Sequence, residues 1–214
     1  MTTEIISIIY HEKDWQETAS LLSETGLKTT FVDRGGVGSL AKAYNEGVGR
    51  IVESGTNPDY VWLVSNIYLG EPDIHEYLIA ALGRLDRSFV AIHPCFASDH
   101  EFCRCNGEGE ASEVPYIEFT APLIRFEVLK QFPLNESMPY WGHDLDWGYR
   151  VRMNGHKIAV ANRISVGHVY IRNAKKEKVT MDRLNLRRKT DVKTRTELIR
   201  LYGQNWREVL NYKG

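Results

Sequence analysis

Several features that mark large classes of protein are missing from this 214-residue sequence. No apolar run approaches the roughly 20 residues that a transmembrane helix needs. The first residues, Met1 to Glu4, lack the basic start of a secretory signal. The chain has only three cysteines, an odd number that fits a reducing compartment better than a disulfide framework. We therefore expect a cytoplasmic chain, and its length fits one domain with a substantial core.

Phosphate-loop and zinc signatures are also missing. No Gly-Lys-Ser/Thr sequence occurs, and the glycine run at residues 35–38 fits neither the ATP-binding loop nor the dinucleotide fingerprint. We interpret that run as a turn between a strand and a helix. Residues 93–115 contain all three cysteines with two histidines, but not the paired Cys-x-x-Cys of structural zinc sites. The spacing favours a polar loop with incidental thiols over a zinc site.

Charge is nearly balanced overall, with a formal net charge of -1, but it is unevenly distributed. After residue 171 there are 13 lysines and arginines against 5 acidic residues. A basic tail on an acidic body indicates either a solvated helical surface or an anionic partner, such as phosphate, a membrane surface or nucleic acid. Nucleic acid is the less favoured partner because the tail lacks interleaved aromatic residues for base stacking. Peripheral membrane contact through the tail stays open.

Short β-branched apolar runs alternate with helical patterns along the chain. This alternation predicts βαβ units and an α/β fold with a mainly parallel sheet, flanked by helices and followed by a helical C-terminal tail. The tail pattern predicts two short helices within residues 198–210, broken at Gly203. Strands are predicted over residues 4–10, 28–33, 60–64, 88–92, 116–120, 157–161 and 164–169, and helices over residues 15–25, 39–50, 72–85, 124–131 and 147–153.

Polar side chains follow three of the predicted strands. They include Tyr10, His11 and Glu12 after the first strand, Asp33 at the end of the second, and Ser65-Asn66 after the third. Parallel sheets of this class bind ligands at the carboxyl ends of their strands. We therefore expect a ligand site at that edge of the sheet.

Residues 139–150, which read PYWGHDLDWGYR, set Asp144 and Asp146 beside His143 between two tryptophans. The pattern predicts a loop leading into a helix that stops at Asn154-Gly155. A carboxylate at a helix start is often only a cap. Here aromatic rings crowd the charged group, which favours a site that faces a ligand. Such a carboxylate would deprotonate a hydroxyl group.

Residues 140–150 resemble the W-G-E-D-x-D-x-x-x-R signature of GT-A-fold glycosyltransferases, in the large inverting family that uses nucleotide-sugar donors. Residues 120–129 are similar to the segment that precedes the signature, and residues 32–33 and 43–48 to the nucleotide-binding half. The resemblance implies a glycosyltransferase domain over residues 1–171, with a nucleotide-binding half (1–92) and an acceptor half (93–171). Residues 172–214 would then be a basic helical extension that packs on the same domain.

The resemblance also implies a role for each matching residue. Asp144 would be the general base, supported by its neighbours in the signature. The donor would be a UDP- or GDP-sugar, and the acceptor a hydroxyl group on a glycan, a lipid-linked sugar or another molecule. The implied catalytic set is Asp144, Asp146 and His143, the donor-binding set Tyr10, His11, Glu12, Asp33, Asn45, Ser65, Asn66 and Arg150, and the metal or diphosphate ligands His168 and Asn66.

The sequence departs from the family where an Asp-x-Asp metal motif is expected, because Ser65-Asn66-Ile67 stands there. His143 also replaces the glutamate before the catalytic aspartate. Three explanations stay open. The enzyme is metal-independent and holds the diphosphate with His168, His143 or tail arginines such as Arg172. Alternatively it binds Mg²⁺ or Mn²⁺ weakly, or it has lost catalysis and keeps only nucleotide-sugar or glycan binding.

Overall fold

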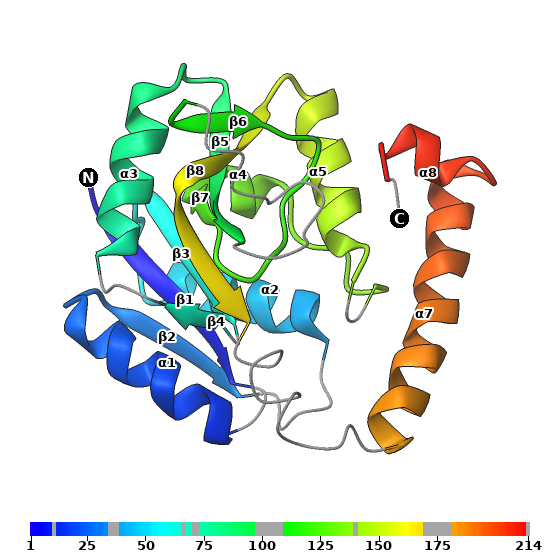
Figure 1. Cartoon of the computed structure of the whole chain (residues 1–214), viewed down its shortest axis with the longest axis horizontal. Coiled ribbons are helices and arrows are strands. Elements are labelled where there is room, and N and C mark those ends of the chain that lie inside the picture. The colour runs from blue at the N-terminus through cyan, green and yellow to red at the C-terminus, as the bar shows by residue number, and fades with distance from the viewer. Residues whose placement is uncertain are drawn as a thin grey trace.

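The structure, a computed structural model, describes residues 1–9, 12–33, 39–65, 67–69, 73–96, 109–138, 141–168 and 181–212. Within these ranges an eight-stranded sheet is flanked by helices (Figure 1). The strands are β1 (Thr3–Ile9), β2 (Thr29–Asp33), β3 (Tyr60–Ser65), β4 (Ile67–Leu69), β5 (Phe89–Phe96), β6 (Ala111–Glu113), β7 (Leu123–Arg125) and β8 (Lys157–His168). The helices are α1 (Glu12–Glu24), α2 (Leu40–Glu53), α3 (Ile74–Arg84), α4 (Phe126–Gln131), α5 (His143–Met153), α7 (Met181–Tyr202) and α8 (Trp206–Val209).

The sheet is mixed and mainly parallel, in the order β2-β1-β3-β7-β5-β8-β4, with β6 on the side of β8. Strand β1 is parallel to both β2 and β3, and β5 is parallel to β8. The short strand β7 is antiparallel to β3 and β5 and joins the two parallel groups. The apolar runs of β1 and β3 form strands because both faces of the sheet are covered: β1 is buried from Glu4 to Ile8, and every residue of β3 is buried. The predicted α/β fold class is confirmed.

Local signals placed several boundaries correctly. Ser39 caps α2, its hydroxyl accepting a hydrogen bond from the Lys42 N–H at 3.2 Å. Gly26 and Gly155, which follow α1 and α5, have φ of 65° and 81°, values that glycine adopts without the strain of a side chain. Gly203 has φ of 79° and separates α7 from α8, as the tail pattern predicted.

The predicted strand over residues 116–120 is wrong, because these residues form no regular strand and β7 lies further along, at Leu123–Arg125. Side chains take up backbone groups that a sheet ladder would use. The Tyr44 hydroxyl donates to the Phe119 carbonyl at 2.9 Å, and the Trp62 indole N–H donates to the Ala121 carbonyl at 3.0 Å. Because β7 occupies Leu123–Arg125, the helix predicted from residue 124 begins only at Phe126.

Two further corrections concern β5 and β8. The strands predicted over 157–161 and 164–169 are one continuous strand, and the polar pair Asn162-Arg163 falls where the β5–β8 register shifts between Pro94 and Cys95. Such a bulge absorbs the break in the apolar pattern. The loop predicted over 93–115 is partly strand, since β5 extends to Phe96 and β6 begins at Ala111.

Cys95 is disulfide-bonded, which contradicts the expectation of three incidental thiols. The other two cysteines, Cys103 and Cys105, lie outside the described residues. None of the helices in the described ranges combines the length and apolar character that a bilayer span requires.

The C-terminal helices lie beside α5 (Figure 1). Leu198 of α7, Trp206 of α8 and the following Leu210 form a second apolar cluster with Met138 and Leu145, separate from the core of the sheet. Helix α7 is far longer than predicted, because its polar N-terminal half gives no apolar periodicity to read. The C-terminal segment thereby covers the side of α5 where the signature lies.

Candidate active site

The first turn of α5 holds Asp144 in a fixed position. Gly142 precedes the helix with φ of 88°, and the Asp144 carboxylate accepts hydrogen bonds from the Gly142 N–H at 2.8 Å and the Leu145 N–H at 3.0 Å. A carboxylate at this place satisfies N–H groups that the helix start leaves without partners. The capping role and the predicted reactive role therefore fall on the same side chain.

The surroundings of Asp144 raise the pKa of its carboxyl group above the ordinary value of 3.8. Loss of solvent is the main cause, and the neighbouring carboxylate of Glu118 adds to it, while His143 and the two backbone N–H groups act in the opposite direction. Asp144 is half-buried and Glu118 is half-buried beside it. A carboxylate whose pKa is moved toward neutrality is a stronger base than an ordinary one.

Asp146 lies two residues beyond Asp144 in α5, and only 3% of its surface is exposed. Both of its carboxylate oxygens accept hydrogen bonds. One carboxylate oxygen accepts from the Arg150 Nε at 2.8 Å, and the other accepts from the Tyr202 hydroxyl at 2.6 Å. Arg150 also donates to the Pro133 carbonyl at 2.7 Å. This network ties α5 to α7 and to the segment after α4. Burial and the hydrogen bond to Asp146 raise the pKa of Tyr202, so its hydroxyl stays a donor.

Removing the Tyr202 hydroxyl should weaken the fold. Tyr202→Phe leaves one oxygen of a buried carboxylate without its donor, and we expect a loss of about 1.5–3 kcal/mol in the free energy of unfolding. Urea denaturation measures it. Tyr149→Phe is the matched control, since the Tyr149 ring packs edge-on against Tyr202 at 5.1 Å and its hydroxyl has no hydrogen bond to a described residue. Equal stability of the two variants would contradict the network.

His143 is held in the core. It is 2% exposed, its Nδ1 donates to the Met138 carbonyl at 3.3 Å, and the Phe119 ring lies edge-on to it at 5.9 Å. Burial is the largest influence on its pKa and lowers it, against the opposing effect of the Asp144 carboxylate. The imidazole is therefore neutral at pH 7 and would not hold a diphosphate by charge.

A short segment connects α5 with the strand ends. The Ser65 N–H, at the carboxyl end of β3, donates to the Thr120 carbonyl at 2.8 Å. The neighbouring Phe119 ring packs edge-on against Trp147 of α5 at 5.2 Å. His93 holds the same segment, because its Nε2 lies 3.0 Å from the Thr120 hydroxyl oxygen. Two contacts, Ser65 to Thr120 and Phe119 to Trp147, thus connect the helix of the candidate base with the sheet edge where the sequence predicts the nucleotide-sugar site.

That edge collects some of the predicted donor-binding residues. Asp33 is the last residue of β2 and pairs with Ile9, while Ser65 ends β3 and pairs with Ile8, so the two flank the end of β1. Asn45, on α2, is used internally: its amide donates to the Leu134 carbonyl at 2.9 Å and to Glu136 at 3.0 Å, and it accepts from the Leu134 N–H.

The remaining predicted site residues are not described at the level of side chains. Tyr10, His11 and Asn66 lie outside the described residues, as does Arg172. Glu12 begins α1 and His168 ends β8, where it pairs with Ile67, but their side chains are not described. The roles that the resemblance gives to these residues stay predictions.

The expected metal position is only partly described. Mg²⁺ and Mn²⁺ favour carboxylate oxygens, whereas Ser65, a residue that is 4% exposed at the end of β3, carries only a hydroxyl group. Asn66 and the His168 side chain lie outside the described residues. Among the described side chains, no group of three or more His, Cys, Asp or Glu residues could hold a metal ion.

The structure adds three residues to the candidate site. Glu118 acts on Asp144 through its charge, and Tyr202 binds Asp146. Burial is the main cause of the raised pKa of Tyr212, and the charge of Asp144 adds to it. Tyr212 stacks on Trp206 at 5.4 Å and on Trp141 of the signature at 6.2 Å. The sequence analysis gave no role to Tyr202 or Tyr212, and Glu118 was hidden in a strand pattern.

No family model matches the sequence, and no curated protein matches it. Solved structures do match. Glucosyl-3-phosphoglycerate synthase from Mycobacterium tuberculosis, in complex with Mn²⁺, UDP-glucose and phosphoglyceric acid, gives a TM-score of 0.60 at 11% identity, over 90% of this chain and 78% of that one. TarS residues 1–349 from S. aureus gives 0.57 at 12% identity, over 98% and 69%.

GalNAc-T7 with UDP, GalNAc and Mn²⁺ gives a TM-score of 0.56 at 10% identity. The match covers 78% of this chain and 44% of GalNAc-T7, so this chain spans less than half of that protein's length. At these identities the likeness establishes the fold. The chain has the GT-A fold that the resemblance at residues 140–150 implied.

Proposed function

We propose that this protein is an inverting glycosyltransferase that moves a sugar from a nucleotide diphosphate to an acceptor hydroxyl group, with Asp144 as the general base. The observation that carries the proposal is the position of Asp144 on a GT-A fold. Its half-buried carboxylate is oriented by two backbone N–H groups and has a raised pKa. Helix α5, which bears it, is linked through Phe119 and Thr120 to the carboxyl end of β3.

The chemistry needs one base and one leaving group on opposite sides of the sugar. The acceptor oxygen attacks the anomeric carbon, its proton passes to the Asp144 carboxylate, and the bond from that carbon to the diphosphate oxygen breaks. The nucleoside diphosphate departs with the electron pair, and attack from the opposite face inverts the anomeric configuration. Holding the acceptor oxygen in line with this bond supplies much of the rate.

The donor would lie across the ends of β1, β2 and β3, as ligands do in open sheets of this kind. Asp33 would bind the base or ribose, and Ser65 would border the sugar-diphosphate. Tyr10, His11, Glu12, Asn66 and Asn45 complete the donor set by resemblance. Arg150 and Asp146 orient α5, and we give His143 a packing role. Ser65-Asn66-Ile67 provides no carboxylate where the family has its metal motif, so we route none of these steps through a metal. His168 stays a candidate for contact with the diphosphate.

The raised pKa of Asp144 sets the expected pH dependence. Only the ionised carboxylate accepts the proton, so kcat/KM should fall as pH falls through the pKa of this group. The acid limb should have its midpoint above 3.8, the ordinary value for aspartate. A pH–rate profile of the purified protein measures it. An acid limb at or below the ordinary value would contradict the environment assigned to Asp144.

A donor screen tests the function itself. The protein is incubated with UDP- and GDP-sugars, with and without Mn²⁺, and release of free nucleotide diphosphate is followed. UDP-glucose and UDP-GalNAc come first, because UDP-sugars or UDP accompany the similar structures. We expect nucleotide release that increases when an acceptor with free hydroxyl groups is added. Saturable binding without any release would instead favour a non-catalytic binding module on the same fold, the alternative suggested by Ser65-Asn66-Ile67.

A further inference from the structure

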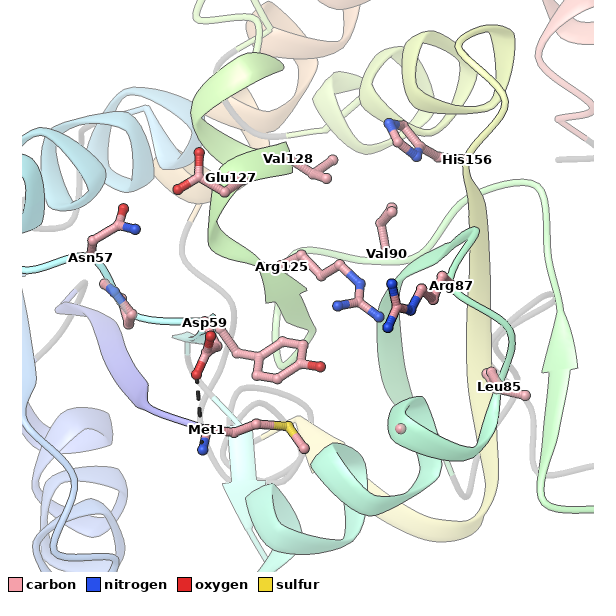
Figure 2. A pocket seen from close by; sticks show the side chains of 13 residues that line it. Met1, Asn57, Asp59, Leu85, Arg87, Val90, Arg125, Glu127, Val128 and His156 are labelled. Atoms are coloured by element: carbon pink, nitrogen blue, oxygen red, sulfur yellow. Dashed lines mark ion pairs between the residues drawn. The ribbon is translucent and has the colours of Figure 1, made fainter.

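A cavity of about 640 Å³ lies at the other end of the sheet from the candidate active site (Figure 2). It is formed where β3 begins at Tyr60, where β7 ends at Arg125, and before β5 begins at Phe89. Because β1, β3 and β5 run in the same direction, these are their amino ends, opposite to Asp33 and Ser65. The cavity therefore belongs to neither the donor site nor Asp144.

Two arginines meet in this cavity. Figure 2 shows the side chains of Arg87 and Arg125 pointing toward one another, with His156 also at the rim. Arg125 uses its Nε to donate to the Phe89 carbonyl at 3.2 Å, and its guanidinium lies 5.5 Å from the centre of the Tyr60 ring. Its two terminal nitrogens have no hydrogen-bond partner among the described residues. Arg87 forms no hydrogen bond or ion pair with any described residue.

Acidic side chains in the cavity do not balance these two charges. The Asp59 carboxylate accepts the Thr2 N–H at 2.6 Å, and Glu127 pairs with Lys130 at 2.8 Å. Each acid is thus engaged elsewhere, while two guanidinium groups face each other. Two like charges that point toward one another repel, and an anion between them would relieve that repulsion.

We propose that this cavity binds a phosphate monoester, held between the guanidinium groups of Arg87 and Arg125. Guanidinium groups bind phosphate through paired N–H donors, and two of them match a dianion better than a carboxylate with its single charge. The volume exceeds what a phosphate group needs. Leu85, Val90 and Val128 line the rest, and they would contact the organic part of the ester.

An NMR titration of the full chain tests the proposal. Inorganic phosphate, phenyl phosphate and acetate are added in turn at matched ionic strength, and backbone amide shifts are followed. We expect saturable shifts at residues 87, 125 and 156 with phosphate, tighter binding of phenyl phosphate, and much weaker binding of acetate. No saturable shift at these residues, or acetate binding equal to phosphate, would overturn the proposal.

Variants separate the site from general surface charge. Arg87 is exposed and pairs with no residue that the structure describes, so Arg87→Gln should fold normally. It should weaken phosphate binding by about tenfold or more, the loss expected for charge-assisted donors. Arg84→Gln is the control, because that arginine ends α3 nearby and already pairs with Glu110. Arg125→Lys keeps the charge, removes the planar fork, and should also weaken binding. Equal affinity of the Arg87 and Arg84 variants would overturn the site.

The phosphate would come either from a soluble ester or from a lipid headgroup. Co-sedimentation with phosphatidylcholine vesicles that contain phosphatidic acid, abolished by Arg87→Gln, would identify the lipid as its source. Saturation by phenyl phosphate without co-sedimentation would identify a soluble ester, and either result supports the site. Because Asp144 lies at the opposite end of the sheet, Arg87→Gln should leave sugar transfer unchanged. The two proposals therefore fail independently.

Discussion

Replacing Asp144 with asparagine should reduce the turnover of sugar transfer by about 10³-fold, within the range that a general base supplies. Asparagine keeps an oxygen that accepts from the Gly142 and Leu145 N–H groups, so the helix start should be preserved. It cannot take up the acceptor proton. Single-turnover kinetics with the donor found in the screen measure the loss, and donor affinity, measured by calorimetry, should be unchanged. Turnover near the wild-type rate would show that another residue is the base.

The same variant should be at least as stable as the wild type at pH 7. The folded protein raises the pKa of Asp144, so the contribution of this group to stability is full below the ordinary pKa and is lost as pH rises through the folded pKa. Asparagine is neutral at every pH and avoids that loss. Urea denaturation at pH 7 and pH 4 should show a larger advantage for Asp144→Asn at pH 7. This control separates lost catalysis from lost folding.

Gly142→Ala should destabilise the protein by about 2–4 kcal/mol, since it combines two costs. The backbone there has φ of 88°, which strains any residue with a Cβ atom. An added Cβ would also lie 2.6 Å from Thr194 Cγ2 and 3.1 Å from Met138 Sδ, and both side chains are fully buried. The start of α5 and the cluster that joins it to α7 would have to move apart. Urea denaturation measures the change in the free energy of unfolding.

Gly155→Ala is the matched control for that prediction. Gly155 has φ of 81°, but an added Cβ would meet nothing within 4 Å. It should therefore show the backbone strain alone, about 1 kcal/mol. Equal losses at Gly142 and Gly155 would mean that α7 does not press on the start of α5. A larger loss at Gly142 would support the packing of the C-terminal helices over the signature.

The fold could be predicted where local signals agree with long-range packing. Apolar β-branched runs gave β1, β2 and β3, and Ser39 and the glycines after α1 and α5 marked helix boundaries correctly. The prediction for residues 116–120 failed because their strand-like alternation reflects burial of Ile117 and Phe119. Tyr44 instead binds the Phe119 carbonyl, and Trp62 and His93 bind the backbone of the next residue after the segment, Ala121. Those partners lie far away in the sequence, so no local pattern could reveal them.

The candidate site was predicted in part for a similar reason. The signature places Asp144, Asp146 and Arg150 on one helix, and the structure adds what the helix contacts. Glu118 and Tyr202 reach the signature from segments 26 residues before Asp144 and 56 residues beyond Asp146. The effect of burial on the pKa values of Asp144 and His143 also required the structure, because it depends on which segments of the chain cover these side chains.

The most direct test of the account is where a nucleotide binds. The labelled full chain is titrated with UDP and then with GDP, and backbone amide shifts are mapped by NMR. The account predicts that one of the two nucleotides shifts Asp33 and Ser65 at the strand ends and Gly142 before α5. Shifts confined to the opposite end of the sheet, around Arg87 and Arg125, would contradict it.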